Sequence, residues 1–169
     1  MSTHLIVGPT GSGKSRHLQE LITQPATGPA TTTWAITPRS ELAAADRRAT
    51  PDGAEQMLDH ALTIVDQRNA RLRDARQRAH QPTQAEPRVR LLIDEAEHLL
   101  RRETTAEQLY RLVTTGRPAA VETVIAVADL RLSTWPYGLR DHCLAGTVTL
   151  LRGARTVPGH QALADVPQD

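Results

Sequence analysis

Residues 8–15 of the chain read Gly-Pro-Thr-Gly-Ser-Gly-Lys-Ser, which fits the pattern G-x-x-x-x-G-K-[ST] at every required position. A short apolar, β-branched segment at Thr3–Val7 precedes this loop, and apolar residues at helical spacing follow it over residues 14–22. Strand, glycine-rich loop and helix in this order turn successive backbone N–H groups and the positive end of the helix toward phosphate oxygens. The sequence therefore predicts a nucleoside triphosphate site within an α/β fold.

The side chains of this loop have distinct expected roles. Lys14, the only lysine in the chain, is expected to be the catalytic cation that bridges the phosphates, and the Ser15 hydroxyl is expected to be a ligand of Mg²⁺. The motif therefore predicts ATP and Mg²⁺ as cofactors. The predicted nucleotide-binding residues are Gly8, Pro9, Thr10, Gly11, Ser12, Gly13, Lys14, Ser15 and Arg16.

A second candidate motif follows a near-continuous apolar run at residues 89–93, which is the pattern of a strand covered on both faces. Asp94 and Glu95 come directly after this run. We expect Asp94 to hold hydrated Mg²⁺ as a metal ligand, and Glu95 to be the catalytic base that deprotonates the attacking water. An Asp-Glu pair can also simply begin a solvated helix, where acids favour the first turn. The position after a buried strand favours the functional interpretation.

Strands and helices are expected to alternate along the chain, which predicts an α/β fold with a mainly parallel central sheet. About five strands are expected, at residues 3–7, 31–37, 89–93, 121–128 and 147–151. Helices are expected at residues 14–22, 41–48, 54–79, 96–102 and 105–113. The strand at 31–37 separates the two motifs, and this order, with a catalytic glutamate, is typical of motor-type ATPases rather than nucleotide kinases or GTPases. We expect one ATPase motor domain over residues 1–155 and a loosely docked tail over residues 156–169.

Composition excludes several other classes of protein. The formal net charge is +1, so no global basic field drives binding to nucleic acid. The single cysteine, Cys143, excludes an intramolecular disulfide framework, and no spacing of Cys or His indicates zinc. No apolar run approaches the roughly 18 residues that cross a bilayer. The motif begins too near the first residue for a signal peptide to precede it, so we expect a cytoplasmic protein with no membrane insertion of its own.

Beyond the phosphate loop, four stretches in order resemble the FtsK/SpoIIIE/HerA group of DNA-pumping ATPases. The first is Ile-Thr-Pro-Arg at 36–39, at the place where the family has Asp-Pro-Lys. The other three are the long helix over 54–73, the strand that ends in two acids and its helix over 92–100, and the Gly-Arg segment over 113–120. The resemblance spans residues 3 to about 152, and its individually specific parts are the phosphate loop and the strand that ends in two acids. It implies a three-layer P-loop NTPase fold of the RecA/FtsK type, in a minimal motor core of the kind expected on an actinobacterial plasmid, integrative element or phage.

The resemblance also implies a mechanism and partners. Family members hydrolyse ATP at subunit interfaces of a ring and move double-stranded DNA, so we expect DNA and further copies of this chain, six in a ring, as partners. Membrane-bound, conjugation or packaging proteins are further expected partners. Arg117 matches the family's Gly-Arg segment and is the expected catalytic arginine finger, supplied to the neighbouring subunit. Arg152 and Arg155 are alternative fingers, and an ordinary surface role for Arg117 is the other interpretation.

The chain departs from the family at the end of the fourth strand, where a glutamine senses the γ-phosphate in family members. Here Asp129 occupies the aligned position, and an ionised carboxylate cannot donate a hydrogen bond to phosphate. Asp129 is therefore either a modified sensor or a sign of lost activity. Two alternatives to a DNA motor stay open. A small nucleotide or metabolite kinase would also suit the chain length and the phosphate loop. A non-hydrolysing nucleotide-binding subunit that regulates a larger motor is the alternative that Asp129 favours.

Two further groups of residues have open interpretations. Seven arginines lie between residues 68 and 90, but those on the long helix are spread around its axis, which favours a solvated helix over a DNA-binding face. In the loop after the fourth strand, Arg131 and Arg140 flank Trp135 and Tyr137. In one interpretation this loop lines a DNA pore, where the arginines contact the DNA backbone and an aromatic ring stacks on the bases. In the other, Trp135 packs into the protein core.

Overall fold

The fold is described from a computed structural model, over residues 3–23, 30–40, 42–131, 135–136 and 138–154. The strands are β1 (Thr3–Val7), β2 (Thr31–Ile36), β3 (Arg47–Ala49), β4 (Arg88–Ile93), β5 (Val121–Val127) and β6 (Thr147–Leu150). The helices are α1 (Lys14–Thr23), α2 (Ala54–Asp74), α3 (Glu97–Leu100), α4 (Glu103–Thr115) and α5 (Leu139–Leu144). The tail expected over residues 156–169 lies outside the described residues.

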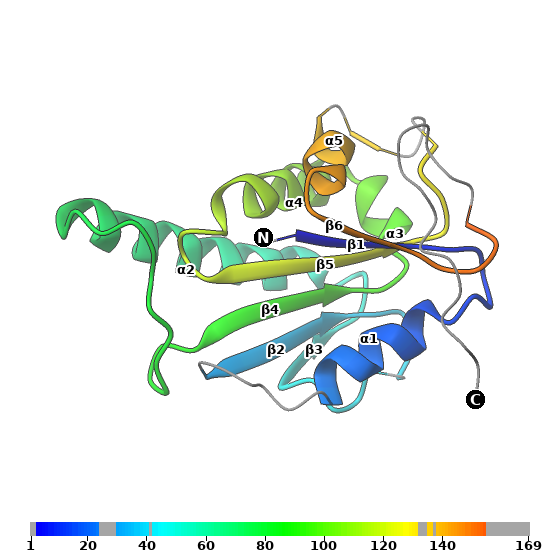
Figure 1. The fold of residues 1–169 in the computed structure, drawn as a ribbon, viewed down its shortest axis with the longest axis horizontal. Coiled ribbons are helices and arrows are strands. Elements are labelled where there is room, and N and C mark those ends of the chain that lie inside the picture. Colours follow the sequence, from blue (N-terminus) through cyan, green and yellow to red (C-terminus); the bar gives the residue numbers. More distant parts are fainter. Residues whose placement is uncertain (1–2, 24–29, 41, 132–134, 137, 155–169) are drawn as a thin grey trace.

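The six strands form one sheet in the order β3-β2-β4-β5-β1-β6, and every neighbouring pair is parallel. The expected α/β class and parallel sheet are confirmed, with one strand more than the five expected. Helix α1 covers one face of the sheet, and α2, α4 and α5 cover the other (Figure 1). The carboxyl-terminal halves of β1, β4 and β5 are unbroken apolar runs because both faces of the sheet are buried there. In β1, Leu5 and Val7 belong to the core under α2 and α4, and Ile6 to the core under α1.

The additional strand β3 corrects one expectation. A short helix was predicted over residues 41–48, but the described residues of this segment form turns and then β3 at the edge of the sheet. Asp46 explains the difference, because its carboxylate accepts hydrogen bonds from the Thr33 N–H at 2.7 Å and the Thr32 hydroxyl at 3.1 Å. The Asp46 N–H also donates to the Thr33 carbonyl at 2.8 Å. These contacts tie the segment to β2, and no local sequence pattern reports them.

Helix α2 was predicted to reach residue 79, and it ends at Asp74. Its apolar positions Leu58, Leu62, Val65 and Leu72 are buried as predicted. Residues 73–79, by contrast, include no large apolar side chain that could be buried. Arg76 takes a left-handed conformation with φ 52°, which ends the helix. No helix within the described part of the chain is both long and apolar enough to cross a membrane.

Arg68 is a second correction. It was grouped with solvated arginines of α2, but its side chain is buried, and its guanidinium donates to the carbonyls of Ala119 at 2.9 Å and Pro87 at 2.8 Å. Burial lowers the pKa of Arg68 from its ordinary value. Arg68 therefore joins α2 to the segments that precede β4 and β5, and it is not available as a free surface charge.

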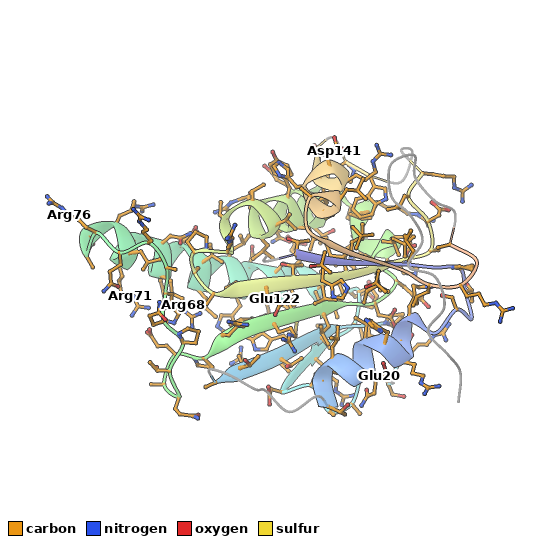
Figure 2. All side chains as sticks on the ribbon, viewed as in Figure 1. Glu20, Arg68, Arg71, Arg76, Glu122 and Asp141 are labelled. Atoms are coloured by element: carbon orange, nitrogen blue, oxygen red, sulfur yellow. The ribbon has the colours of Figure 1, made fainter. Side chains whose placement is uncertain are left out.

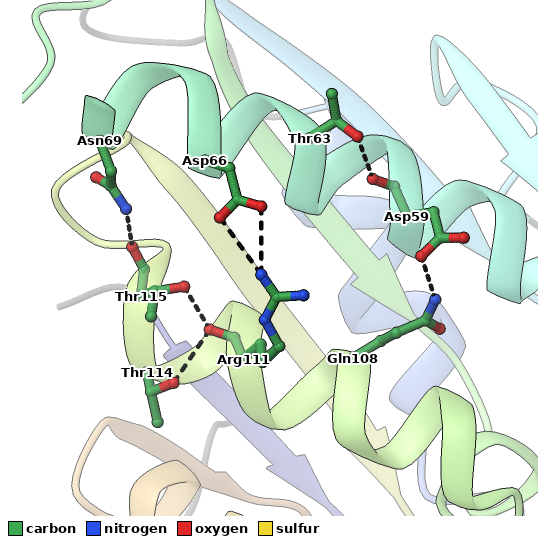
Figure 3. A network of polar contacts seen from close by, with 8 residues as sticks. All are labelled: Asp59, Thr63, Asp66, Asn69, Gln108, Arg111, Thr114 and Thr115. Carbon is green, nitrogen blue, oxygen red and sulfur yellow. Dashed lines mark hydrogen bonds and ion pairs between the residues drawn. The ribbon is translucent and has the colours of Figure 1, made fainter. Parts of the chain in front are cut away.

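Polar contacts also hold α2 against α4 along their exposed side (Figure 3). The Gln108 amide donates to the Asp59 carboxylate at 2.6 Å, and the Arg111 guanidinium lies 3.2 Å from a carboxylate oxygen of Asp66. These contacts fix the register of the two helices above the core that they share.

Candidate nucleotide-binding site

The phosphate loop connects the carboxyl end of β1 to α1, at the edge where all parallel strands end. Gly11 and Gly13 have φ values of 81° and 93°, in the left-handed region that non-glycine residues rarely adopt. Gly8 is needed for a different reason, because a Cβ there would lie 2.9 Å from the Leu151 Cβ. The glycines thus let the loop turn tightly while it packs against the chain that follows β6.

Lys14 is the first residue of α1 and lies within the curve of the loop. Its side chain is buried, and Nζ donates to the carbonyls of Gly8 at 2.7 Å and Pro9 at 3.1 Å. Two neutral carbonyls hold the Lys14 ammonium, and the nearby Asp94 carboxylate interacts with it electrostatically. This charge is therefore positioned to bind an anion at the loop.

Ser15 and Asp94 meet although they are far apart in sequence. The Ser15 hydroxyl donates to Asp94 Oδ2 at 2.9 Å, and Asp94 is almost fully buried. Burial raises the pKa of the Asp94 carboxyl, and the hydrogen bond from Ser15 opposes this shift. One hydroxyl and one carboxylate are the hard oxygen donors that suit Mg²⁺, which keeps several of its own waters. The pair therefore fits Mg²⁺, and within the described residues no cluster of three or more His, Cys, Asp or Glu side chains offers another metal site.

Glu95 lies beside this pair in a strained conformation. Strand β4 ends at Ile93, so Asp94 and Glu95 both lie just beyond the strand. Asp94 is buried, whereas Glu95 is only half-buried. Glu95 has φ 50°, and its N–H donates to Asp94 Oδ1 at 3.0 Å. A non-glycine residue held at positive φ is a feature of functional sites, because surrounding contacts must maintain it. The Glu95 side chain is 34% exposed and can reach solvent beside the loop.

The Glu95 carboxylate has two neighbours, one arginine and one histidine, that sequence reasoning did not identify. Arg39 Nη2 lies 3.3 Å from Glu95 Oε1, and His98 Nε2 lies 3.7 Å from Oε2. Arg39 follows β2, which is the neighbour of β4 in the sheet. The parallel pairing of β2 and β4 therefore places this cation beside the predicted catalytic base. The only signal in the sequence was the position of Arg39 at the end of the second expected strand.

Strand β5 lies between β1 and β4, so the residues that follow it are next to both motifs. The Ala128 N–H donates to Glu97 Oε1, which joins the end of β5 to α3. Asp129 accepts hydrogen bonds from the Arg131 N–H at 3.0 Å and from Arg131 Nε at 2.8 Å. These bonds to Asp129 raise the pKa of Arg131. The predicted sensor position is therefore a carboxylate already engaged by a cation.

The structure does not bring Arg117 to this site within one chain. Arg117 is exposed and precedes β5, whereas the phosphate loop lies at the carboxyl ends of the strands. The seven residues of β5 span roughly 23 Å at the usual rise per residue. Arg152 lies nearer to the phosphate loop, because it follows β6 and adjoins Gly153. A Cβ added at Gly153 would lie 3.2 Å from the Pro9 ring. Arg155 lies outside the described residues.

The remaining predicted residues are divided between surface and core. Arg16 is highly exposed and pairs with Glu20 at 3.2 Å on α1. Trp135 is only 8% exposed and belongs to the main hydrophobic core, so the core interpretation holds for this residue. The Arg140 guanidinium lies 3.4 Å from the Leu130 carbonyl. Tyr137 lies outside the described residues.

The loop, the buried lysine, the Ser15–Asp94 pair and the adjacent Glu95 together define an ATPase domain of the P-loop class. The sequence matches the AAA domain family over residues 2–129, and the chain belongs to this family. No curated protein matches the sequence significantly.

Solved structures share the fold at low sequence identity. The cytoplasmic domain of the Thermomonospora curvata type VII secretion ATPase EccC is similar, with a TM-score of 0.73, 18% identity and coverage of 89% of this chain and 20% of that chain. ATPases 2 and 3 of EssC from Geobacillus thermodenitrificans give a TM-score of 0.69 and 13% identity over 89% of this chain and 32% of that chain. The pCW3 conjugation coupling protein TcpA, in its monomer form with ATPγS, gives a TM-score of 0.62 and 18% identity over 84% of this chain and 47% of that chain. The chain therefore spans less than half the length of each of these structures.

Proposed function

We propose that the chain binds ATP with Mg²⁺, hydrolyses it, and uses the cycle as the motor domain of a double-stranded DNA translocase. The observation that carries the hydrolysis proposal is the 2.9 Å contact between Ser15 and Asp94, with Glu95 directly beside it. Two oxygen donors for Mg²⁺, a buried cation and the partly exposed Glu95 carboxylate meet at one edge of the sheet. A metabolite kinase needs a second substrate pocket beside this edge, and a cavity of about 400 Å³ does lie there, lined by residues 37–40 and 48–50. The feature that favours hydrolysis over a kinase is therefore the glutamate that follows β4.

Each side chain has a defined part in this proposal. The backbone N–H groups of the loop and the Lys14 ammonium bind the phosphate oxygens and stabilise their charge. Ser15 and Asp94 would hold Mg²⁺, which when bound neutralises phosphate charge. Glu95 accepts a proton from water positioned above the loop, a role that general bases perform with rate gains of about 10²–10⁴. The strained backbone of Glu95 fixes the direction from which the carboxylate approaches.

Support for a DNA substrate comes from the ordered resemblance to DNA-pumping ATPases and from the fold shared with a conjugation coupling protein. A protein substrate is the second candidate, because EccC (ATPases 2 and 3) has been solved in complex with a signal sequence peptide. The non-hydrolysing subunit is the third, because Asp129 is engaged by Arg131 at the position of a γ-phosphate sensor.

ATP turnover by the full chain, measured with and without linear double-stranded DNA and over a range of protein concentrations, tests the proposal. We expect turnover per chain to rise with concentration and with DNA, because in the proposed ring a neighbouring copy supplies the arginine that meets the γ-phosphate. Arg117→Ala and Arg152→Ala should each be mixed with Glu95→Gln chains, since only the true finger variant regains activity when an intact finger meets an intact Glu95. No turnover under any condition supports the regulatory subunit, and turnover independent of concentration and DNA contradicts the ring motor.

Replacing Arg39 should increase the basal rate. The Glu95 carboxylate must leave the Arg39 guanidinium before it turns toward water, and partly exposed ion pairs are worth about 0.2–1 kcal/mol. Arg39→Ala should therefore raise kcat for ATP about 1.4-fold to fivefold with KM unchanged. Arg39→Lys, which keeps the charge, is the matched control and should retain the parent rate. A lower kcat in Arg39→Ala would mean that Arg39 assists hydrolysis instead of restraining Glu95.

A further inference from the structure

One cavity lies far from the phosphate loop, between α2, strand β2, the edge strand β3 and the loop that precedes β4. Its volume is about 320 Å³, and its lining includes Thr32 and Val89 from the amino-terminal halves of β2 and β4. The cavity is on the α2 side of the β3 edge, whereas the phosphate loop follows β1, with β4 and β5 between them. It therefore has no part in the nucleotide site.

One wall of this cavity is a preorganised cation. The Arg47 guanidinium lies 4.9 Å from the centre of the Trp34 ring, and its Nη1 lies 2.7 Å from His60 Nδ1. Arginine only donates, so His60 Nδ1 is the acceptor in this contact. The Trp34 and His60 rings are themselves 5.0 Å apart. Stacking and one hydrogen bond thus hold the exposed Arg47, and most of its five donors remain for a ligand.

The opposite wall already binds a carboxylate. Arg71 Nη1 donates to Glu86 Oε1 at 2.7 Å, and this bond lowers the pKa of Glu86. Figure 2 shows Arg68 and Arg71 on the side of α2 that faces the returning loop, while Arg76 projects from the end of the helix. Arg47, Arg68, Arg71 and Glu86 line the cavity. Because backbone carbonyls hold the buried Arg68 and Glu86 pairs with Arg71, Arg47 is the cation that faces a ligand. A ligand with one carboxylate would balance its charge.

Between the charged walls the lining combines apolar residues with the polar side chains of Thr32 and Gln67. Ile64 is half-buried, Val89 and Trp34 are almost fully buried, and Pro87 borders the same space. A volume of about 320 Å³ accommodates one large side chain and its neighbours, but not a nucleic acid duplex. Phosphate-backbone binding also depends on exposed cations on an accessible surface rather than on a partly apolar hollow.

We propose that this cavity, lined by Arg47, Ile64 and Arg71, is a docking site for a partner protein segment in which a large apolar residue adjoins an aspartate or glutamate. The apolar side chain fills the space over Ile64 and Val89, and the carboxylate accepts hydrogen bonds from Arg47. This site is independent of the proposed hydrolysis, since none of its residues touches the phosphate loop. It would let the ATPase engage a partner at the edge of the sheet opposite β6.

Three fluorescein-labelled peptides test the proposal by anisotropy with the full chain. The probe is Gly-Ser-Leu-Asp-Trp-Glu-Gly-Ser, the uncharged control replaces Asp and Glu with Asn and Gln, and the polar control replaces Leu and Trp with Ala. We expect the probe to bind roughly tenfold or more tightly than either control, which is the effect of one hydrogen bond to a charged group. Its affinity should fall as salt rises, because the carboxylates meet arginine near the surface.

Arg47→Glu and Ile64→Ser should each weaken probe binding, Arg47→Glu by roughly tenfold or more. Arg73→Glu is the matched control, because Arg73 is exposed on α2 outside the cavity lining, and it should bind the probe within about twofold of the parent. ATP affinity should stay unchanged in all three variants, which separates this site from the nucleotide site and confirms folding. Equal binding of the three peptides, or no binding of any, overturns the proposal. Displacement of the probe by double-stranded DNA in an Arg47-dependent manner overturns it in favour of a nucleic acid ligand.

Discussion

Lys14→Ala should abolish tight ATP binding. The Lys14 ammonium is buried, and its hydrogen-bond partners are the neutral carbonyls of Gly8 and Pro9, so its charge is available to phosphate oxygens gathered by the loop. Two charge-assisted hydrogen bonds of about 1.5–3 kcal/mol each correspond to a loss of affinity of roughly 100-fold or more. Titration with a fluorescent ATP analogue in the presence of Mg²⁺ measures this loss directly.

The control for this variant must separate loss of a cation from loss of the fold. Arg73→Ala removes one positive charge from the exposed surface of α2 and should leave ATP affinity unchanged. Thermal unfolding should show that Lys14→Ala keeps a cooperative transition, because the Lys14 ammonium donates to loop carbonyls and Lys14 belongs to neither hydrophobic core cluster. Equal ATP affinity in Lys14→Ala and the parent chain would contradict the nucleotide site itself, and with it the proposed motor.

Local patterns in the sequence predicted the central sheet and the arrangement of the phosphate loop. Glycine at positions 11 and 13 indicates positive φ, and the structure has it at both. The apolar runs before the loop and before Asp94 indicate buried parallel strands, and parallel strands end at one edge. The approach of Ser15 to Asp94 is a consequence of these two patterns, since each residue follows a central strand.

Contacts between distant segments could not be predicted in this way. Strand β3 depends on the Asp46 carboxylate reaching β2, and the segment contains residues that local propensity assigns to a helix. Arg68 has the same spacing from its neighbours as the exposed arginines of α2, and only the carbonyls of Ala119 and Pro87 distinguish it. The Arg39–Glu95 pair depends on β2 and β4 being neighbours, which the order of elements along the chain does not state.

The expected arginine finger illustrates the same limit at the level of assembly. Residues 113–120 matched a family segment and precede the strand expected at 121–128, but a match in order carries no information about how neighbouring subunits meet. The fold puts Arg117 at the amino end of β5 and Arg152 at the nucleotide edge. A ring in which Arg117 serves a neighbour must therefore bring the amino-terminal edge of one sheet to the carboxyl-terminal edge of the next. Mixing the two arginine variants with Glu95→Gln distinguishes these geometries.

Glu95→Gln should bind ATP as the parent chain does and hydrolyse it about 10²–10⁴ times more slowly. Glutamine keeps the size of the side chain and an oxygen that accepts a hydrogen bond from Arg39, so the strained backbone and the neighbouring Asp94 contact persist. What it loses is the ability to take a proton from water. Single-turnover phosphate release measures the rate, and nucleotide titration of the same sample establishes that binding is retained.

Glu97→Gln is the matched control because it makes the same substitution two residues further along. Glu97 accepts the Ala128 N–H, a structural contact that the glutamine oxygen can replace, so Glu97→Gln should hydrolyse ATP within a few-fold of the parent rate. If Glu97→Gln were the slow variant and Glu95→Gln were not, Glu97 would be the base. If both variants turned over at the parent rate, the strained conformation of Glu95 would serve only to shape the end of β4. Loss of turnover confined to Glu95→Gln would place the proton transfer at Glu95, beside the Mg²⁺ ligands and above the loop that holds the phosphates.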